Sequence, residues 1–251
     1  NLRHLAHLIG SDRPFYGLQA RGLLGDEEPH RTIEAAAADY IAEMRQVQPH
    51  GPYYLGGFSG GGITAYEIAH QLRTQGEEVA ALVLLDTPLP VRPIMDRGDR
   101  LRTKLQDIQR GGPMYLVNWF KSRVAWEIAK RKGREESAEE GQQFHNLAIQ
   151  DAFLESVGAY QVKPWDGTMA LFRPPLVPKW TVGNRLISSE RTYLYPDNDW
   201  TQFVPGLEVF EVPGDHDSMV LEPNVRVLAA RIRRYLERPV GVATNYREAA
   251  E

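Results

Sequence analysis

The chain has 251 residues, of which 42% are hydrophobic and 25% charged, a composition that allows a soluble globular fold with a sizeable core. Its net charge of −4 gives no electrostatic reason to expect nucleic acid or an anionic membrane as a partner. Cysteine is absent, which excludes disulfides, thiolate catalysis and cysteine-based metal sites. The longest apolar run, residues 79–85, is too short to span a bilayer, and no secretory signal is visible, so we expect a cytoplasmic protein.

The first part of the chain predicts a helix, a strand and a second helix. Residues 2–9 place their leucines and isoleucine on one helical stripe. Residues 14–20, PFYGLQA, are rich in aromatic and apolar side chains and predict a short strand. Thr32 is a suitable N-cap for a helix over residues 33–48, which Pro49 ends.

A strand–helix–strand unit follows. Residues 52–59 predict a strand, and apolar side chains then recur at helical spacing from residue 61 until Gly76 stops the helix. Residues 78–86, EVAALVLLD, form a continuous apolar run that suits a strand buried on both faces of a parallel sheet. This order indicates a βαβ unit and therefore an α/β fold.

The rest of the chain predicts a helical insertion followed by a return to the sheet. Residues 87–166 are charged and mostly helical by pattern, whereas residues 167–175 and 207–214 read as strands, and Pro223 can start a last helix over residues 224–237. We expect a core built from residues 1–86 and 167–239. Residues 87–166 are expected to form a helical lid, and residues 240–251 a polar tail.

The stretch Gly57-Phe58-Ser59-Gly60-Gly61 fits the pattern G-x-S-x-G between a predicted strand and a predicted helix. Glycines two positions to either side of a serine allow the tight turn that exposes its hydroxyl as a nucleophile. The N–H of Gly60, at the start of the helix, is then suited to stabilise an oxyanion. The alternative is a glycine-rich turn that packs closely or binds phosphate, although no P-loop pattern follows.

A serine nucleophile needs a base and an acid. Of seven histidines, only His216 follows a predicted strand at a late βα loop, the edge at which α/β sites lie, although a structural role is the competing interpretation. Asp86 ends the buried strand and also points off the carboxyl edge of the sheet, but an acid there can instead form a turn. Asp197 and Asp199 are alternative acids nearer to the histidine in sequence.

Several stretches together resemble the thioesterase domains that end polyketide and non-ribosomal peptide synthetases, which are α/β-hydrolases. The resemblance covers about residues 5–90 and 205–236, and between them only the habit of a variable helical lid is shared. It is carried by DRPFYGLQARGL, VQPHGPYYLGGFSGGGITAYEIAHQL, ALVLLDTPLP and VPGDHDSMVLEPNV. It implies an α/β-hydrolase fold, with a mostly parallel sheet flanked by helices.

The resemblance also implies Ser59 as the acyl nucleophile, His216 as its base and Asp86 as the partner of the histidine. An acid directly after the strand that follows the elbow helix is similar to the chain-terminating type. The substrate that the resemblance implies is a thioester on the phosphopantetheine arm of an acyl or peptidyl carrier protein, expected upstream in the same polypeptide. The implied release is by hydrolysis or macrocyclisation. No metal and no cofactor of its own is implied. The alternatives are a stand-alone editing thioesterase, a carboxylesterase, or a non-catalytic binding protein with this fold.

The insertion suggests two further roles, each with a structural alternative. Its aromatic residues can line an acyl channel or can form the core of the lid itself; they are Tyr115, Trp119, Phe120, Trp126, Phe144 and Phe153. The basic stretch 121–134 can dock an acidic carrier protein. Because four glutamates follow it at once, a solvated charged helix is the competing interpretation.

The start of the chain departs from the family pattern. The family normally begins with further strands and a loop that supplies the second oxyanion N–H, whereas this sequence opens inside the helix that follows them. A missing central strand leaves backbone groups unpaired. We therefore expect the native protein to have more residues upstream, which carry the second oxyanion donor.

Overall fold

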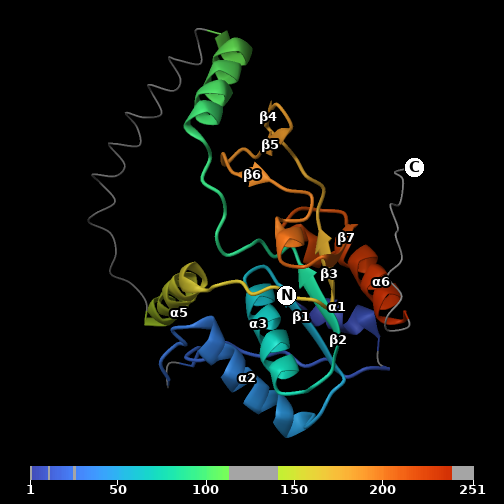
Figure 1. The fold of residues 1–251 in the computed structure, drawn as a ribbon. Coiled ribbons are helices and arrows are strands. Elements are labelled where there is room, and N and C mark those ends of the chain that lie inside the picture. Colours follow the sequence, from blue (N-terminus) through green and yellow to red (C-terminus); the bar gives the residue numbers. More distant parts are fainter. Residues whose placement is uncertain (1, 11, 25–26, 113–140, 239–251) are drawn as a thin grey trace. The chain divides into compact units, whose positions relative to one another are not determined.

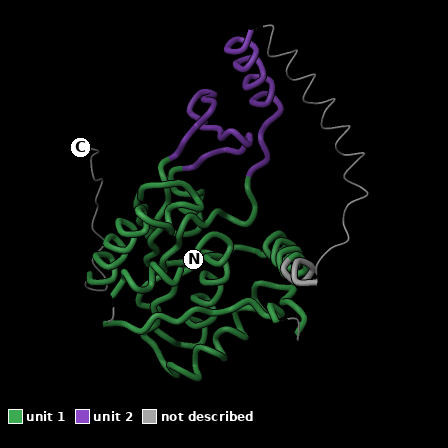
Figure 2. Tube along the Cα trace, turned by 180° about the vertical axis from the view of Figure 1, so that it is seen from behind, with its two compact units in different colours: residues 1–92, 147–175, 196–251 green, residues 93–146, 176–195 purple. Residues whose placement is uncertain are grey.

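The computed structural model describes residues 2–10, 12–24, 27–112 and 141–238 of the chain (Figure 1). The chain divides into two compact units, shown in Figure 2. The first unit comprises residues 1–92, 147–175 and 196–251, and the second unit comprises residues 93–146 and 176–195. Ser59, Asp86 and His216 all belong to the first unit.

The first unit is built on a four-stranded sheet in the order β1-β2-β3-β7. All three neighbouring pairs are parallel, as expected for strands joined by helical crossovers. The strands are β1 (Tyr53–Phe58), β2 (Val79–Leu85), β3 (Thr168–Arg173) and β7 (Gly206–Glu211). The predicted α/β core with a mostly parallel sheet is confirmed.

The register of this sheet explains which residues can meet above it. Phe58 of β1 pairs with Leu85 of β2, Leu85 pairs with Phe172 of β3, and Phe172 pairs with Phe210 of β7. The four strands therefore end at nearly the same level. Because parallel strands share one carboxyl edge, the segments that follow β1, β2 and β7 emerge side by side.

Helices cover both faces of the sheet (Figure 1). On one face lie α2 (Ile33–Val47) and α3 (Gly61–Thr74), and on the other lie α1 (Leu2–Ile9) and α6 (Asn224–Leu236). The N-cap of α2 is Thr32, whose hydroxyl accepts a hydrogen bond from the Ala35 N–H at 3.2 Å, as its position in the sequence predicts.

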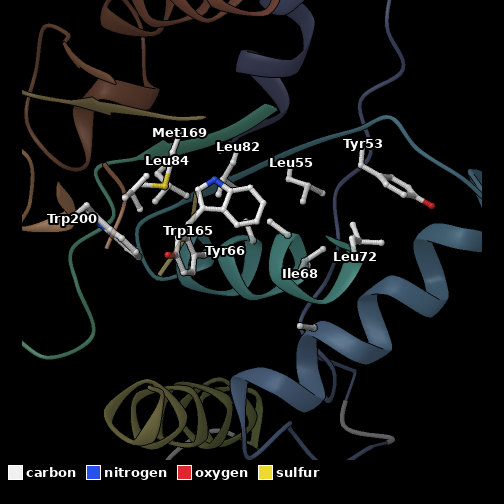
Figure 3. Close-up of a cluster of buried hydrophobic side chains, with 14 of the residues drawn as sticks. Tyr53, Leu55, Tyr66, Ile68, Leu72, Leu82, Leu84, Trp165, Met169 and Trp200 are labelled. Carbon is white, nitrogen blue, oxygen red and sulfur yellow. The ribbon is translucent and has the colours of Figure 1, made fainter. Parts of the chain in front are cut away.

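Alternate residues of the central strands enter different halves of the core. Leu82 and Leu84 of β2 belong to the cluster that includes Tyr66 and Leu72 of α3, part of which is drawn in Figure 3. Val83, one position out of phase, belongs to the cluster on the α6 face. Period-two alternation with burial on both sides is why these strands appear in the sequence as unbroken apolar runs.

A buried carboxylate ties α3 to the segment after α5 (Gly141–Ala159). Glu67 of α3 is 1% exposed, and it accepts a 2.8 Å hydrogen bond from the Tyr160 hydroxyl. The Lys163 ammonium approaches both carboxylate oxygens at 3.2 Å. A buried carboxylate needs such partners, so this contact fixes the end of α5 against α3.

The second unit contains a small three-stranded sheet that the sequence does not predict. A helix covers residues 97–112, and β4 (Trp180–Val182), β5 (Arg185–Ile187) and β6 (Tyr193–Leu194) form a separate antiparallel sheet. Strands of two or three residues are too short to show alternation, so the pattern gave no signal. The buried Asp99 carboxylate joins the helix to this sheet by accepting hydrogen bonds from Arg185 at 2.7 Å and from Tyr193 at 2.9 Å.

The strand predicted over residues 14–20 is wrong. This segment is extended without a strand assignment, and Phe15, Tyr16 and Leu18 are all exposed. Aromatic composition alone does not make a strand, because a strand also requires a neighbour that takes up its backbone hydrogen bonds. Among the described residues, no helix is long and apolar enough to cross a membrane.

Candidate active site

Ser59 lies at the turn between β1 and α3. Its backbone is in the left-handed region, with φ of +53°, which is uncommon for any residue other than glycine. The Ser59 N–H still donates to the Leu85 carbonyl at 2.8 Å, as the next rung of the parallel ladder. Two residues later the chain is helical, because α3 begins at Gly61. The serine therefore occupies a sharp strand-to-helix turn, as the sequence pattern predicts.

The glycines around the serine differ in how much space they need. A Cβ on Gly57 would lie 2.3 Å from the Gly61 carbonyl oxygen, and a Cβ on Gly62 would lie 2.0 Å from the Thr87 hydroxyl oxygen. At Gly61, by contrast, a Cβ would meet nothing within 4 Å. The expectation that both Gly57 and Gly61 must lack a side chain for clearance is therefore correct for Gly57 and wrong for Gly61. At Gly61 only the close approach of its backbone to Gly57 matters.

This difference predicts opposite outcomes for two neighbouring substitutions. Gly57→Ala is expected to destabilise the fold by about 3 kcal/mol, because backbone atoms on both sides of the turn have to separate. Gly61→Ala is expected to leave stability unchanged or to raise it by up to about 1 kcal/mol, since alanine favours the helix more than glycine does. Urea unfolding followed by circular dichroism measures both, and equal effects of the two variants would contradict this description of the turn.

Gly60 faces a residue of the predicted insertion. A Cβ on Gly60 would lie 2.4 Å from Cε1 of the Phe153 ring, so this ring packs directly against the residue that follows Ser59. Phe153 comes from α5, and it also contacts the small buried cluster of Ile33, Ile63 and Tyr160. Among the aromatic candidates, Phe153 is thus brought to the elbow, whereas Tyr115, Trp119, Phe120, Trp126 and the Phe144 side chain lie outside the described residues.

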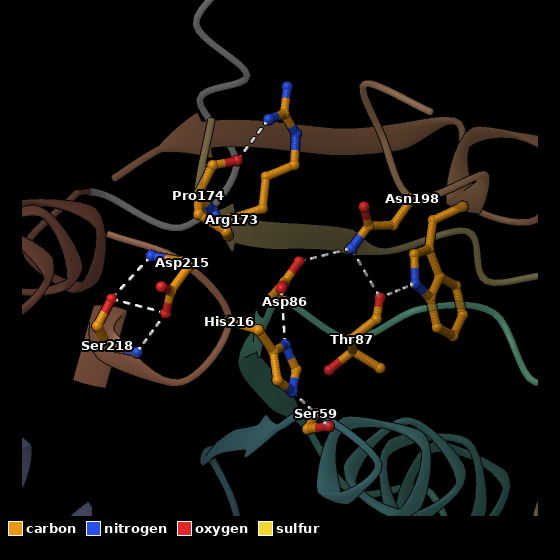
Figure 4. A network of polar contacts seen from close by, with 10 residues as sticks. Ser59, Asp86, Thr87, Arg173, Pro174, Asn198, Asp215, His216 and Ser218 are labelled. Carbon is orange, nitrogen blue, oxygen red and sulfur yellow. Dashed lines mark hydrogen bonds and ion pairs between the residues drawn. The ribbon is translucent and has the colours of Figure 1, made fainter. Parts of the chain in front are cut away.

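The structure brings Ser59, His216 and Asp86 together from three segments (Figure 4). The His216 Nε2 lies 3.0 Å from the Ser59 Oγ, and its Nδ1 lies 2.7 Å from the Asp86 Oδ2. A carboxylate can only accept, so Nδ1 carries a proton and donates it to Asp86. The neutral ring then presents an unprotonated Nε2 to the serine hydroxyl, as a general base must.

The surroundings of His216 favour its charged form. Its pKa is raised above the ordinary 6.5, first by the hydrogen bond to Asp86 and then by the charges of Asp86 and Asp217. Burial and the positive charge of Arg92 act in the opposite direction. The ring also stacks on Phe58, with centroids 5.0 Å apart, which limits its rotation. An imidazole in this setting is well suited to receive a proton from the serine.

The loop that carries His216 is held by a local hydrogen-bond network (Figure 4). Gly214 has φ of +103°, a conformation that glycine adopts without strain. The Asp215 carboxylate accepts from the Ser218 N–H at 2.8 Å and from the Ser218 hydroxyl at 2.7 Å. The loop after β7 thereby turns back over the sheet edge, and His216 sits at its tip.

Asp86 lies at the other end of the hydrogen-bonded series that begins at Ser59, and it has fixed contacts of its own. It has φ of +44°, and its N–H donates to the Phe172 carbonyl at 2.8 Å. Its Oδ1, the oxygen that does not face the histidine, accepts a 3.1 Å hydrogen bond from the Asn198 side-chain amide. Asn198 is not among the site residues that the sequence predicts, although it lies between the two aspartates of YPDNDW that are alternative acids.

Those two aspartates, considered as alternative acids, make other contacts. The carboxylate of Asp197 accepts hydrogen bonds from the N–H groups of Asp199 and Thr201, at 3.0 and 3.1 Å, at the start of the short 3₁₀ helix η1 (Trp200–Gln202). The side chain hydrogen-bonded to His216 is that of Asp86. Within the described residues, no group of three or more His, Cys, Asp or Glu side chains is arranged to hold a metal ion.

Comparisons with known proteins identify the family of this chain. A family model described as a thioesterase domain matches residues 3–149. The dimodular nonribosomal peptide synthase of Bacillus subtilis (strain 168) is 38% identical over 179 residues, which are 68% of this chain and 7% of that protein. The chain thus spans only a small part of this curated relative.

Two solved structures show a similar fold. A four-domain nonribosomal peptide synthetase bound to AMP and glycine aligns with a TM-score of 0.58 and 26% identity, over 88% of this chain and 17% of that chain. The NocB thioesterase domain from the nocardicin cluster aligns with a TM-score of 0.59 and 22% identity, over 94% of this chain and 86% of that chain. With a family match over more than half of its length, the chain belongs to the thioesterase domain family and has the α/β-hydrolase fold.

Proposed function

We propose that this chain is a chain-releasing thioesterase domain that frees an acyl or peptidyl group from a carrier protein through an acyl-serine intermediate. The observation that carries the proposal is the continuous hydrogen-bonded series from the Ser59 hydroxyl through His216 to Asp86, at 3.0 and 2.7 Å. The dimodular nonribosomal peptide synthase, which matches 68% of the chain, supports a role in releasing the product of such a synthase.

In the first half-reaction, the Ser59 Oγ attacks the carbonyl carbon of the thioester while its proton passes to the His216 Nε2. The tetrahedral adduct collapses as its C–S bond breaks, and His216 returns the proton to the departing phosphopantetheine thiol. Asp86 stays ionised and stabilises the imidazolium. The products are a free thiol on the carrier and an ester on Ser59.

In the second half-reaction, water or a hydroxyl or amine of the bound chain attacks the ester. His216 takes the proton of the attacking group and then gives it to the Ser59 oxygen as the ester C–O bond breaks. Hydrolysis releases an acid, and attack from within the chain releases a macrocycle. Both routes use the same residues, so the choice between them depends on how well water is excluded.

The oxyanion that forms in both steps needs N–H donors. Gly60 is the N-cap of α3, so its N–H lies at the positive end of the helix dipole and is our candidate for one donor. Phe153, whose ring lies against Gly60, is our candidate for contact with the acyl group.

The phosphopantetheine arm belongs to the substrate in this scheme, and the partner is the acyl or peptidyl carrier protein that bears it. The basic stretch 121–134, considered as a docking surface, lies outside the described residues and remains a prediction.

The test compares three substrates of one acyl group: the thioester on its carrier protein, the thioester on free pantetheine, and the p-nitrophenyl ester. We expect kcat/KM for the carrier-bound thioester to exceed that of the pantetheine thioester by about tenfold or more, because docking adds favourable contacts. A fluorophosphonate probe should modify the peptide that contains Ser59, as identified by mass spectrometry. A covalent complex of the NocB thioesterase domain with such an analogue makes this probe class suitable.

Other outcomes assign the chain elsewhere. Fast turnover of the p-nitrophenyl ester with none of the carrier-bound thioester indicates a carboxylesterase. Preference for short or aberrant acyl groups on the carrier indicates the editing type. No probe adduct and no turnover of any substrate, in protein that is folded by circular dichroism, indicates a binding protein and overturns the proposal.

A further inference from the structure

The segment that follows the second unit is attached to the residues at the end of β2 by three hydrogen bonds. The Asn198 amide nitrogen donates to the Asp86 Oδ1 at 3.1 Å and to the Thr87 carbonyl at 3.3 Å. The indole N–H of the fully buried Trp200 donates to the same Thr87 carbonyl at 2.8 Å. Figure 4 shows Asn198 and His216 in contact with the two different oxygens of Asp86.

The orientation of the Asn198 amide follows from its partners. A carboxylate and a carbonyl are both acceptors, so the nitrogen of the amide has to face them and its oxygen has to face away. The backbone of Asn198 has φ of +49°, in the left-handed region that asparagine tolerates better than most residues. The turn is further held by the Asp197 carboxylate, which accepts from the Asp199 N–H. Asn198 is thus a fixed donor rather than a freely rotating side chain.

We propose that Asn198 is a positioning residue for the proposed acyl transfer, which holds the Asp86 carboxylate so that its Oδ2 stays aimed at His216. The inference rests on the proposed function, since it concerns the same triad. Without the amide, the carboxylate loses its second contact and can turn about its Cα–Cβ and Cβ–Cγ bonds, which lengthens the hydrogen bond to the imidazole. Asn198 acts through Asp86 and has no role in bond making.

The charge of the side chain at this position is as important as its shape. Asn198→Asp is isosteric but replaces the donor with an acceptor, so it loses both hydrogen bonds and brings a second negative charge next to Asp86. The charged groups that already act on His216 are Asp86 and Asp217, which favour the imidazolium, and Arg92, which opposes it. An added carboxylate reinforces the first two. It therefore moves the acid limb of the pH–rate profile to higher pH.

The experiment measures kcat and KM for one thioester between about pH 5 and 9 in three variants. Asn198→Gly removes the side chain while keeping a residue that adopts positive φ without strain, and it is expected to lower kcat about tenfold with little change in KM. Asn198→Asp is expected to lower kcat further and to raise the apparent pKa of the acid limb by roughly half a unit. The matched control is Asp199→Asn, at the neighbouring positive φ of +69°, which is expected to leave both quantities unchanged.

The outcomes separate this inference from the proposed function. If Ser59→Ala is inactive and both Asn198 variants keep the kcat and acid limb of the unmodified chain, the positioning role is refuted and the triad stands. If Ser59→Ala retains turnover, the proposed function itself fails. A loss of folding stability in Asn198→Gly with an unchanged kcat per folded molecule means that the residue is only structural, which also overturns the inference.

Discussion

Replacing Ser59 with glycine is expected to abolish acyl transfer and, at the same time, to make the fold more stable. The hydroxyl is the proposed nucleophile, so kcat/KM should fall on the order of 10⁴-fold or more. The backbone at Ser59 has φ of +53°, which glycine adopts without the cost that a residue with a Cβ incurs there. We expect a gain in the free energy of unfolding of about 1 kcal/mol.

Ser59→Ala is the matched control, because it removes the same hydroxyl and keeps the Cβ. It should be as inactive as Ser59→Gly but no more stable than the unmodified chain. Thioester hydrolysis and urea unfolding measure the two properties on the same preparations. Turnover by Ser59→Ala at the original rate refutes the nucleophile. Equal stability of the two variants refutes the account of backbone strain at the elbow.

The two central strands of the sheet could be predicted from the sequence because they are buried on both sides. A continuous apolar run such as residues 79–85, between turn residues, favours a central parallel strand. Residues 14–20 carry aromatic side chains that also suit a strand, but the residue pattern does not show whether a neighbouring strand is present to pair with them. The small sheet of β4, β5 and β6 could not be predicted for a different reason, because its strands are too short to show an alternation of apolar and polar residues.

The principal members of the candidate site could be predicted from where they occur along the chain. Ser59 and Asp86 directly follow paired strands, and the register that aligns Phe58 with Leu85 brings their side chains to one edge. Asn198 could not be predicted, because it does not follow a strand of the main sheet. Its role depends on which of three adjacent polar side chains turns inward. That choice is made by backbone φ values and by the packing of Trp200, neither of which a residue pattern contains.

Asp86→Asn is expected to lower kcat by about 10³- to 10⁴-fold while the chain stays folded. The introduced amide can turn its N–H toward the imidazole Nδ1. The ring proton then sits on Nε2, and this nitrogen can no longer accept a proton from Ser59. Loss of the carboxylate also removes the largest cause of the raised pKa of His216. The acid limb of the remaining activity should therefore move to lower pH, toward or below 6.5.

The same substitution has a signature in stability that is independent of catalysis. Because the pKa of His216 is raised in the folded state, the stabilisation from its contact with Asp86 is fully present below the unfolded value of 6.5 and is lost as pH rises through the folded value. Asp86→Asn should thus be most destabilising in acid and least so well above neutrality. Asp217→Asn is the control: Asp217 also raises the pKa of His216 but only through its charge, so this variant should show a small shift in the same direction with an unchanged plateau kcat. A plateau kcat that falls equally in both variants is incompatible with Asp86 as the specific partner of the histidine.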